Sequence, residues 1–372
     1  MNKWTFPTQI YAGPDSLNRL TEFNNESILI ICDPFLKDSP SLTYVMRLMD
    51  SKNKVTIYTD VVPDPPIAHV VKGIEFMEGI KPTVIIAIGG GSCIDMSKGI
   101  AYFGRKLKHM DIKSFIAVPT TSGTGSEVTS FAVLTDSETQ IKYPLVDDAV
   151  LPDEALLTPL FVKTSPPSVT AFSGMDVLVH ALEAYVATAA NNFTDALAQQ
   201  AIELVFEYLP KCHKSTATEQ DRMSMHEASC LAGLSFNKAG LGIVHAMAHQ
   251  LGGQFHVPHG LANSMLLPYV IGFNCSRNQE VAKKYAHLSA KLGFASHKAS
   301  DGDKLGALLE AIVKLQRTLE CPMTLTEFGV DKATSEAKLN LMADRALEDM
   351  CYRFNPYPAN QDDLISLYEN VM

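Results

Sequence analysis

Histidines gather in one short stretch of the chain, and imidazole is a side chain that can bind metals or move protons. On a helix, His245 and His249 stand four residues apart and therefore share one face. A helix break predicted at Gly252 and Gly253 returns the following chain toward that face. The stretch thus offers four candidate ligands within fifteen residues: His245, His249, His256 and His259.

A second pair repeats this spacing. Asp176 and His180 lie four residues apart in SGMDVLVHALEAY, so one helix presents both side chains inward. A lone histidine on an apolar helix is more often a hydrogen-bonded core residue, but two such pairs favour a metal site. Imidazole and carboxylate together suit iron(II) or zinc better than calcium or magnesium. Because position 246 is alanine, no HExxH motif is present, and the pattern disfavours peptide hydrolysis.

A glycine-rich turn provides a candidate phosphate site. The run VIIAIGGGSCIDMSKGIA is predicted to form a buried strand, a three-glycine turn and a helix. We expect Ser92 to cap this helix, with Asp95 in capping-box spacing. Gly89, Gly90 and Gly91 let the backbone approach a diphosphate at the helix N-terminus. The alternative is an ordinary strand-to-helix turn, since the motif is not GxGxxG.

A second polar loop follows another predicted strand. The segment PTTSGTGSE, residues 119–127, gathers hydroxyl groups around two glycines. Because the ends of parallel strands meet at one sheet edge, both polar segments are expected to lie there. A solvated loop is the alternative reading of this segment. Its candidate cofactor or substrate contacts are Thr120, Thr121, Ser122, Thr124 and Ser126.

One acidic residue bears on the choice of nucleotide. Asp33 directly follows the predicted strand 28–32, where it can accept hydrogen bonds from a ribose and repel the extra phosphate of NADP. The sequence therefore favours NAD. In the usual dinucleotide fold the acidic residue comes about 20 residues after the glycines, whereas Asp33 precedes them, so a different topology is expected. A helix-capping aspartate is the alternative.

Two kinds of scaffold are predicted to position these side chains. The first part alternates short β-branched runs with amphipathic segments, which indicates an α/β domain with a mainly parallel sheet. After Pro166 and Pro167 the periodicity is helical. We predict a nucleotide-binding α/β domain, residues 1–166, and an all-helical metal-binding domain, residues 167–372. The predicted strands are 28–32, 55–58, 84–88 and 115–118, and the predicted helices include 169–189, 194–209, 221–236, 303–319 and 335–351.

Composition excludes several classes of function. The 372 residues carry a formal net charge of −10 with scattered Lys and Arg, which argues against a nucleic-acid binder. No apolar run approaches the roughly 20 residues of a membrane span, and the N-terminus resembles no secretory signal, so a cytoplasmic enzyme of small-molecule chemistry is expected. The seven cysteines form no CxxC pair, and reduced thiols are expected.

Six motifs, taken in order, resemble the iron-containing (group III) alcohol dehydrogenase family. The resemblance runs over essentially the whole chain and, within the family, is nearest to the propanol dehydrogenases of propanediol-using bacterial microcompartments. It implies a Rossmann-like, dehydroquinate-synthase-like α/β domain followed by an all-α domain. Tyr269, Tyr357 and Asp64 depart from residues common in the family. The motifs are GGGSCIDMSK, PTTSGTGSE, GMDVLVHALEAY, GLGIVHAMAHQLGG, PHGLAN and CYRFNPYPA.

The resemblance also implies roles for individual residues. It narrows the candidate ligands to four and places His249 between metal and nicotinamide, as a candidate for proton transfer, while His256 receives no role. Asp33 matches the residue that favours NAD. The implied metal ligands are Asp176, His180, His245 and His259, and the implied cofactor contacts are Gly90, Gly91, Ser92, Asp95, Thr120, Thr121, Thr124 and Lys142.

The implied reaction is interconversion of a short aldehyde such as propanal and a primary alcohol, with NAD and iron(II), or zinc in its place. Alternatives are a glycerol-type dehydrogenase, a dehydroquinate-synthase-like lyase and a non-catalytic microcompartment recruitment module. A lyase for an anionic substrate needs cationic side chains, and the stretch 245–259 has none. A homodimer is implied, with the strand at residues 4–11 crossing between subunits, and microcompartment shell or enzyme partners are possible.

Overall fold

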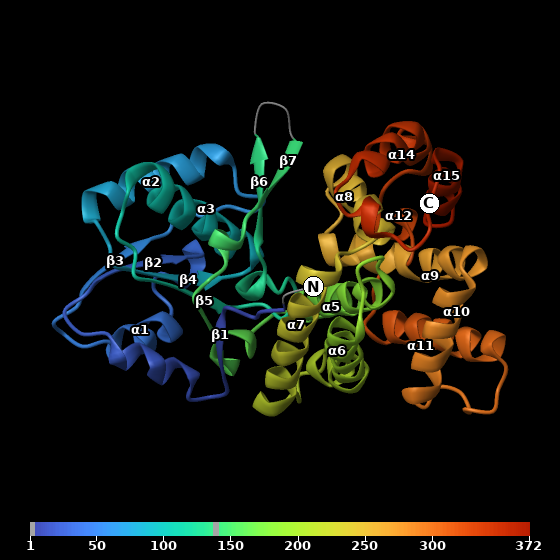
Figure 1. The fold of residues 1–372 in the computed structure, drawn as a ribbon, viewed down its shortest axis with the longest axis horizontal. Coiled ribbons are helices and arrows are strands. Elements are labelled where there is room, and N and C mark those ends of the chain that lie inside the picture. The colour runs from blue at the N-terminus through green and yellow to red at the C-terminus, as the bar shows by residue number, and fades with distance from the viewer. Residues whose placement is uncertain (1–3, 137–140) are drawn as a thin grey trace. The chain divides into compact units, whose positions relative to one another are not determined.

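The computed structural model describes residues 4–136 and 141–372, and the side chains of residues 141 and 142 also lie outside the described part. The chain divides into two compact units, Met1–Ser165 and Pro166–Met372, and the division falls at the double proline. The first unit contains a sheet with helices, and the second contains helices (Figure 1).

A six-stranded parallel sheet organises the first unit. Its strand order is β1-β8-β5-β4-β2-β3. The four predicted strands are confirmed as β2, β3, β4 and β5. The short strand β8 and a separate antiparallel hairpin, β6–β7, were not predicted, whereas β1 overlaps the strand that the family resemblance implied at residues 4–11. The strands are β1 Gln9–Ala12, β2 Ser27–Cys32, β3 Lys54–Tyr58, β4 Val84–Gly89, β5 Ser114–Pro119, β6 Phe131–Asp136, β7 Ile141–Val146 and β8 Glu154–Leu157.

Helices cover both faces of this sheet, which explains why its central strands are continuous apolar runs. Alternate residues of β2 point to opposite faces. Ile28 and Ile30 pack with α1 (Pro40–Leu48) and the 3-10 segment η1 (Ser16–Glu22), while Leu29 and Ile31 pack with α2 (Ile67–Ile80) and α3 (Gly91–Lys108). Figure 1 shows these layers edge-on, with α2 and α3 on one side of the sheet and α1 on the other. Shorter segments are η2 Pro34–Leu36, η3 Ser126–Val128, η4 Asp148–Val150 and α4 Pro159–Val162.

The strand order contains a reversal beside β2. The chain passes from β2 outward to β3 and then returns to place β4 on the other side of β2. Ligands of open α/β sheets bind at such a reversal, beyond the carboxyl ends of the strands. The glycine turn after β4 therefore lies next to the end of β2, which Asp33 directly follows. The two are neighbours although Asp33 precedes the glycines in the sequence.

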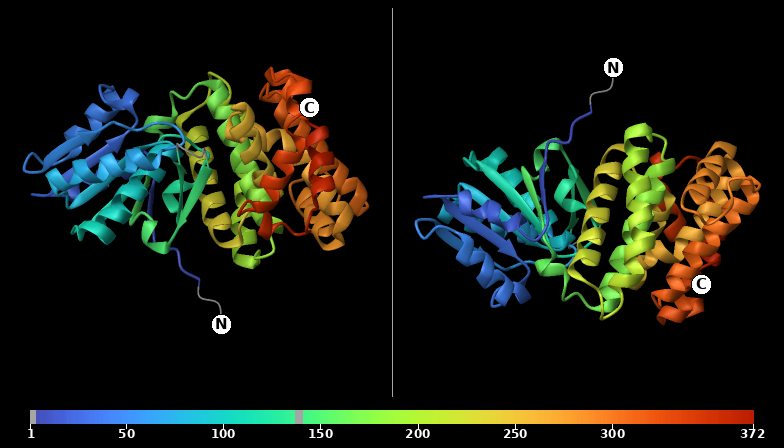
Figure 2. Two further views of the ribbon diagram at one scale, coloured as in Figure 1. Left: turned by 90° about the horizontal axis from the view of Figure 1, so that it is seen from above. Right: turned by 90° about the horizontal axis from the view of Figure 1, so that it is seen from below.

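The second unit is entirely helical over residues 166–372, all of which are described, and this confirms the predicted all-α domain. Helices α5, α6 and α7 lie side by side (Figure 2). The helices are α5 Pro167–Val186, α6 Asn192–Cys212, α7 Glu219–Ala239, α8 Ile243–Phe255, α9 His259–Arg277, α10 Gln279–Lys291, α11 Asp301–Thr318, α12 Leu325–Phe328, α13 Lys332–Glu336, α14 Leu339–Glu348 and α15 Gln361–Glu369, with η5 at Tyr352–Phe354.

Two predictions about helix ends are wrong. The predicted helix 335–351 is divided between α13 and α14, and it stops before Asp349 because that carboxylate accepts a hydrogen bond from the Cys351 amide. Helix α8 does not break at Gly252 and Gly253 but continues to Phe255. His256 then ends it in the left-handed conformation, at φ 56°, with its N–H donating to the Gly252 carbonyl.

No helix among the described residues is long and apolar enough to cross a membrane. The seven cysteines, all within the described part of the chain, are free thiols, as their number and spacing predicted.

Candidate metal centre

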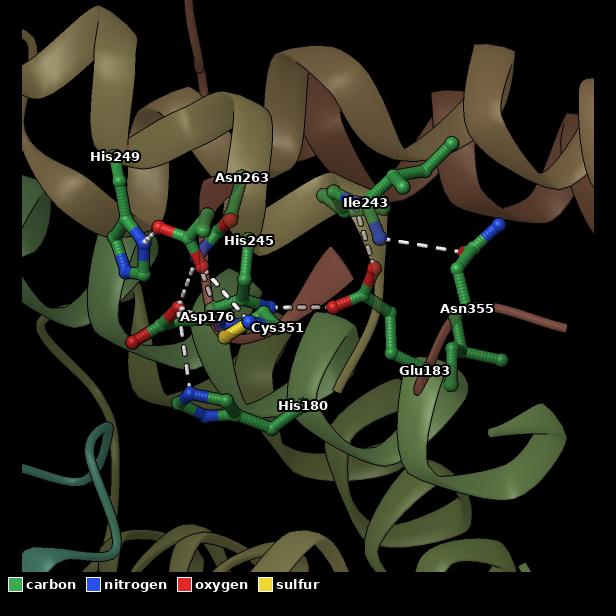
Figure 3. Close-up of polar contacts among 12 residues, drawn as sticks. Asp176, His180, Glu183, Ile243, His245, His249, Asn263, Cys351 and Asn355 are labelled. Carbon is green, nitrogen blue, oxygen red and sulfur yellow. Dashed lines mark hydrogen bonds and ion pairs between the residues drawn. The ribbon is translucent and has the colours of Figure 1, made fainter. Parts of the chain in front are cut away.

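Helix α5 supplies the first half of the site. Asp176 and His180 are buried and project from the same face of α5, as their spacing predicted (Figure 3). The apolar residues around them explain why this helix is buried on nearly all sides over its second half. The His180 ring stacks on Phe236 of α7, with centroids 4.4 Å apart. Packing therefore fixes where these two side chains point.

Helices α8 and α9 supply the second half. His245 lies in the first turn of α8 and is buried, whereas His259 is the first residue of α9 and is 43% exposed. The left-handed turn at His256 reverses the chain between the two helices, so His256 itself is an exposed helix cap. The turn residue and the ligand candidate are thus separated by Val257 and Pro258.

The four predicted ligand residues meet around one point. Their ligand atoms all lie within 4.8 Å of one another. Asp176 Oδ1 lies 3.9 Å from His180 Nε2, 3.7 Å from His245 Nε2 and 3.6 Å from His259 Nε2. Bonds of about 2.1 Å in a tetrahedral site separate neighbouring ligand atoms by about 3.4 Å. One carboxylate oxygen and three imidazole nitrogens at these distances fit iron(II) or zinc.

The charges within the group confirm that its members are strongly coupled. Burial acts to raise the pKa of Asp176, but the imidazoles of His180, His259 and His245 lower it well below its usual range. Burial also acts to lower the pKa of His245, yet hydrogen bonds to Asp176 and Glu183 raise it to about 9. A metal ligand must present a deprotonated nitrogen, so metal binding at this group is expected to depend on pH.

Three residues in or beside the group were missed by the sequence analysis. Asn263 donates to Asp176 Oδ1 at 2.7 Å, and its Nδ2 lies 3.1 Å from Nε2 of both His245 and His259. Its position four residues after His259 was a usable signal, because it places both on one face of α9. Glu183 and Asp349 each bind an imidazole that is far away in the sequence. Glu183 lies three residues after His180 on α5, which was also a usable signal, whereas no local spacing pointed to Asp349.

His249 lies beside the four-residue group but outside it. It projects from α8 one turn after His245, and its ring stacks on that of His259 with centroids 5.3 Å apart. Its Nδ1 is 2.7 Å from Asp349 Oδ2. Burial acts to raise the pKa of Asp349, but the hydrogen bond from His249 lowers it to about 2, so the carboxylate is ionised. This histidine is therefore oriented by a carboxylate next to the candidate metal centre.

Close packing of α9 against α5 makes Gly260 a sensitive position. A Cβ atom there would lie 2.0 Å from the Phe172 carbonyl oxygen and 3.1 Å from Asp176 Cβ. We expect Gly260→Ala to lower the free energy of unfolding of the metal-free protein by about 3 kcal/mol, because backbone must shift to admit the methyl group. Urea denaturation measures this change.

Gly253→Ala is the matched control, because a Cβ at this helical position meets nothing within 4 Å. This variant should be as stable as the original protein or more stable by up to about 1 kcal/mol. Equal stability of both alanine variants would contradict the packing argument for Gly260.

The first unit brings the predicted nucleotide residues to one edge of its sheet. Asp33 Oδ2 accepts a hydrogen bond from the Gly90 amide at 3.1 Å, at the reversal between β2 and β4. A Cβ at Gly91 would lie 2.7 Å from Thr124 Cγ2, and one at Gly90 would lie 3.7 Å from Thr121. The glycines therefore allow the two polar loops to meet, which is the convergence predicted from the rule that parallel strands end at one sheet edge.

Two other predicted nucleotide residues, Ser92 and Asp95, make hydrogen bonds within the first unit that the sequence analysis did not predict. The prediction that Ser92 caps α3 is wrong, because Gly90 is the N-cap of this helix. Ser92 Oγ instead accepts a hydrogen bond from the Asp64 amide. Asp95 accepts from Ser126 Oγ and the Val133 amide, because the β5–β6 connection packs over its helix.

Thr120 and Lys142 complete the predicted nucleotide set. Thr120 is buried, and its amide donates to the Gly89 carbonyl, which ties the end of β5 to the end of β4. The side chain of Lys142 lies outside the described residues.

Known proteins are similar to this chain in sequence or in fold over nearly their whole lengths. The 1-propanol dehydrogenase PduQ of Salmonella typhimurium is 43% identical over 372 residues, with 100% of both chains covered. The NADPH-dependent butanol dehydrogenase of Clostridium saccharobutylicum is 38% identical and covers 100% of this chain and 98% of its own. The crystal structure of a 1,3-propanediol oxidoreductase superposes with a TM-score of 0.92 at 31% identity, with 100% of both chains covered.

Family models account for both units of the chain. The model described as iron-containing alcohol dehydrogenase matches residues 7–159, and the model described as Fe-containing alcohol dehydrogenase family, C-terminal, matches residues 170–372. These matches agree with the motifs, the fold and the full-length relatives. The chain therefore belongs to the iron-containing alcohol dehydrogenase family.

Proposed function

We propose that this alcohol dehydrogenase uses NAD and iron(II) to interconvert a short aldehyde, such as propanal, and the corresponding primary alcohol. The observation that carries the proposal is the convergence of Asp176, His180, His245 and His259, whose ligand atoms lie within 4.8 Å of one another. The choice of a three-carbon substrate rests on the similarity to a 1-propanol dehydrogenase.

The roles of the chain follow from this arrangement. Asp176, His180, His245 and His259 would hold the metal, which would supply Lewis-acid chemistry for the alcohol or aldehyde, and NAD would supply the hydride chemistry. Within the chain, His249 is the proposed proton-transfer residue. Asp349 holds its Nδ1, so Nε2 is the nitrogen that can exchange a proton with the substrate.

The nucleotide is proposed to bind at the carboxyl edge of the parallel sheet, and NAD is favoured over NADP. Asp33 carries that preference, since a carboxylate repels the 2′-phosphate of NADP. Because a relative that is 38% identical is NADPH-dependent, the preference for NAD over NADP needs a test at the level of this residue. The proposed contacts are Asp33, Gly90, Gly91, Ser92, Asp95, Thr120, Thr121, Thr124 and Lys142.

Removal and return of the metal test this function. Protein stripped with a chelator should not oxidise NADH with propanal, and anaerobic addition of iron(II) should restore turnover, because the four-ligand group is then filled. NADH absorbance follows the reaction, and a panel of short aldehydes ranks chain length. Cofactor binding without turnover after iron is restored would contradict the proposal and favour a recruitment role.

We also propose that the chain assembles as a homodimer and associates with a bacterial microcompartment, as the resemblance of its motifs implies. Size-exclusion chromatography with light scattering measures the oligomeric state, and copurification with shell proteins tests the association with a microcompartment. A monomer in solution would contradict the proposed dimer.

A further inference from the structure

Glu183 lies directly behind one of the proposed metal ligands. It follows Asp176 and His180 along the same face of α5, at the next helical turn, and its side chain is buried. Its Oε2 lies 2.6 Å from His245 Nδ1, and its Oε1 accepts a hydrogen bond of 2.7 Å from the Val244 amide (Figure 3). Both carboxylate oxygens are therefore engaged at the start of α8.

The surroundings of Glu183 are built to hold this geometry. The first amides of α8 have no partner within the helix, and Glu183 and Asn355 accept hydrogen bonds from Val244 and Ile243 respectively. A Cβ at Gly242 would lie 2.7 Å from Glu183 Oε1 and 2.8 Å from Asn355 Oδ1, so only glycine admits both side chains. The carboxylate also faces the positive end of the α8 dipole.

We propose that Glu183 is a positioning residue that holds His245 in the tautomer with its proton on Nδ1, so that the Nε2 lone pair faces the metal ligands. The proposal rests on the proposed function. A carboxylate can only accept a hydrogen bond, so a neutral His245 must donate from Nδ1 and keep Nε2 bare. The His180 ring stacks on His245 with centroids 4.6 Å apart, which fixes the imidazole plane as well.

Charge balance supports the same role. Asp176 and Glu183 are both buried, one facing the ligand atoms and one behind His245. Together their two negative charges match the two positive charges of a divalent ion, and a buried ion is stable only when its charge is compensated. Glu183 thus contributes to metal affinity without being a ligand.

Glu183→Gln tests the tautomer directly. Glutamine keeps an oxygen that accepts from Val244 but turns an N–H toward His245 Nδ1. The imidazole must then accept at Nδ1 and carry its proton on Nε2, where a ligand needs a lone pair. We expect zinc affinity to fall by about 10–100-fold, the usual cost of losing such a partner. The zinc affinity is measured in the full-length apoprotein, by competition with a chromophoric chelator for the first equivalent of zinc.

Asp349→Asn is the matched control, because it makes the same change beside His249, the other imidazole paired with a carboxylate on α8. Its zinc affinity should stay within about twofold of the original. Unchanged affinity of Glu183→Gln would overturn the positioning role while leaving the proposed function intact. If the original protein binds zinc no more tightly than His259→Ala does, both the positioning role of Glu183 and the proposed function are overturned.

A second measurement needs no variant at Glu183. In zinc-loaded protein labelled with ¹⁵N-histidine, NMR should show His245 with a protonated Nδ1 that exchanges slowly with water, because its N–H is buried against Glu183. A His245→Gln variant identifies the signal by its loss. A zinc-loaded His245 whose Nδ1 carries no proton would overturn the proposal.

Discussion

Replacing His259 by alanine is expected to remove the metal and nearly abolish turnover while the fold is kept. His259 supplies one of the four converging ligand atoms, yet it is 43% exposed and stands at the first position of α9. Its truncation therefore leaves little buried void. Asp176 and His245, in contrast, are buried, and their replacement would also disturb the core.

The expected size of the effect follows from the chemistry that is lost. Lewis-acid stabilisation by a metal is worth several kcal/mol, so kcat should fall on the order of 1,000-fold. Elemental analysis measures the metal, and NADH consumption measures kcat. Far-UV circular dichroism and thermal unfolding of the metal-free proteins check the fold, because bound metal would itself raise the Tm.

His256→Asn is the control for this experiment. His256 is exposed and caps α8 at φ 56°, a conformation that asparagine tolerates. This variant should retain full metal content and normal turnover, although it removes a histidine three residues away. A His259→Ala protein with full metal occupancy would contradict the ligand assignment.

The candidate metal centre was predictable where its residues obey helical spacing. Asp176 with His180, and His245 with His249, each follow the four-residue period, so their faces could be derived. The chain reversal before His259 was predicted at the wrong residues, because two glycines in α8 do not end the helix while His256 does. Left-handed non-glycine residues are uncommon, and although histidine is enriched among them, as at His109 and His256, nothing local marked His256 rather than the two glycines as the end of the helix.

Which carboxylate pairs with which histidine could not be predicted. Glu183 is 62 residues from His245, and Asp349 is 100 residues from His249. Their proximity depends on tertiary packing of α5, α8 and the segment after α14. The apolar periodicity of residues 335–351 predicted a helix that included Asp349. The Asp349 carboxylate instead accepts a hydrogen bond from the Cys351 amide, and this local interaction opposes the helix there.

The α/β unit was predictable to a greater extent. Buried β-branched runs identified the central strands, whereas β1 and β8 have four residues each and lack such a run. The meeting of Asp33 with Gly90 follows from the rule that parallel strands end at one edge. The strand order that makes β2 and β4 neighbours was not available from local sequence, although the position of Asp33 did indicate an unusual topology.

Removing the charge of Asp33 should shift the enzyme toward NADPH. The Asp33→Asn variant keeps an oxygen that can accept the hydrogen bond from the Gly90 amide, so the turn after β4 is preserved. It removes a negative charge from the end of β2. Two like charges about 4 Å apart repel by about 4 kcal/mol at an effective dielectric constant of 20, and partial exposure of Asp33 reduces this. The ratio of kcat/KM for NADH to that for NADPH should therefore fall by roughly 100-fold.

Most of that change should come from improved use of NADPH, because the carboxylate excludes the 2′-phosphate by repulsion and contributes to NADH binding only through hydrogen bonds to the ribose. Asp38→Asn makes the same charge change at an exposed position five residues later and should leave the ratio unaltered. Steady-state kinetics with both nucleotides at fixed propanal separates the two variants. An Asp33→Asn enzyme that retains the original ratio would show that nucleotide choice is set elsewhere, and it would leave Asp33 with only its structural contact to Gly90.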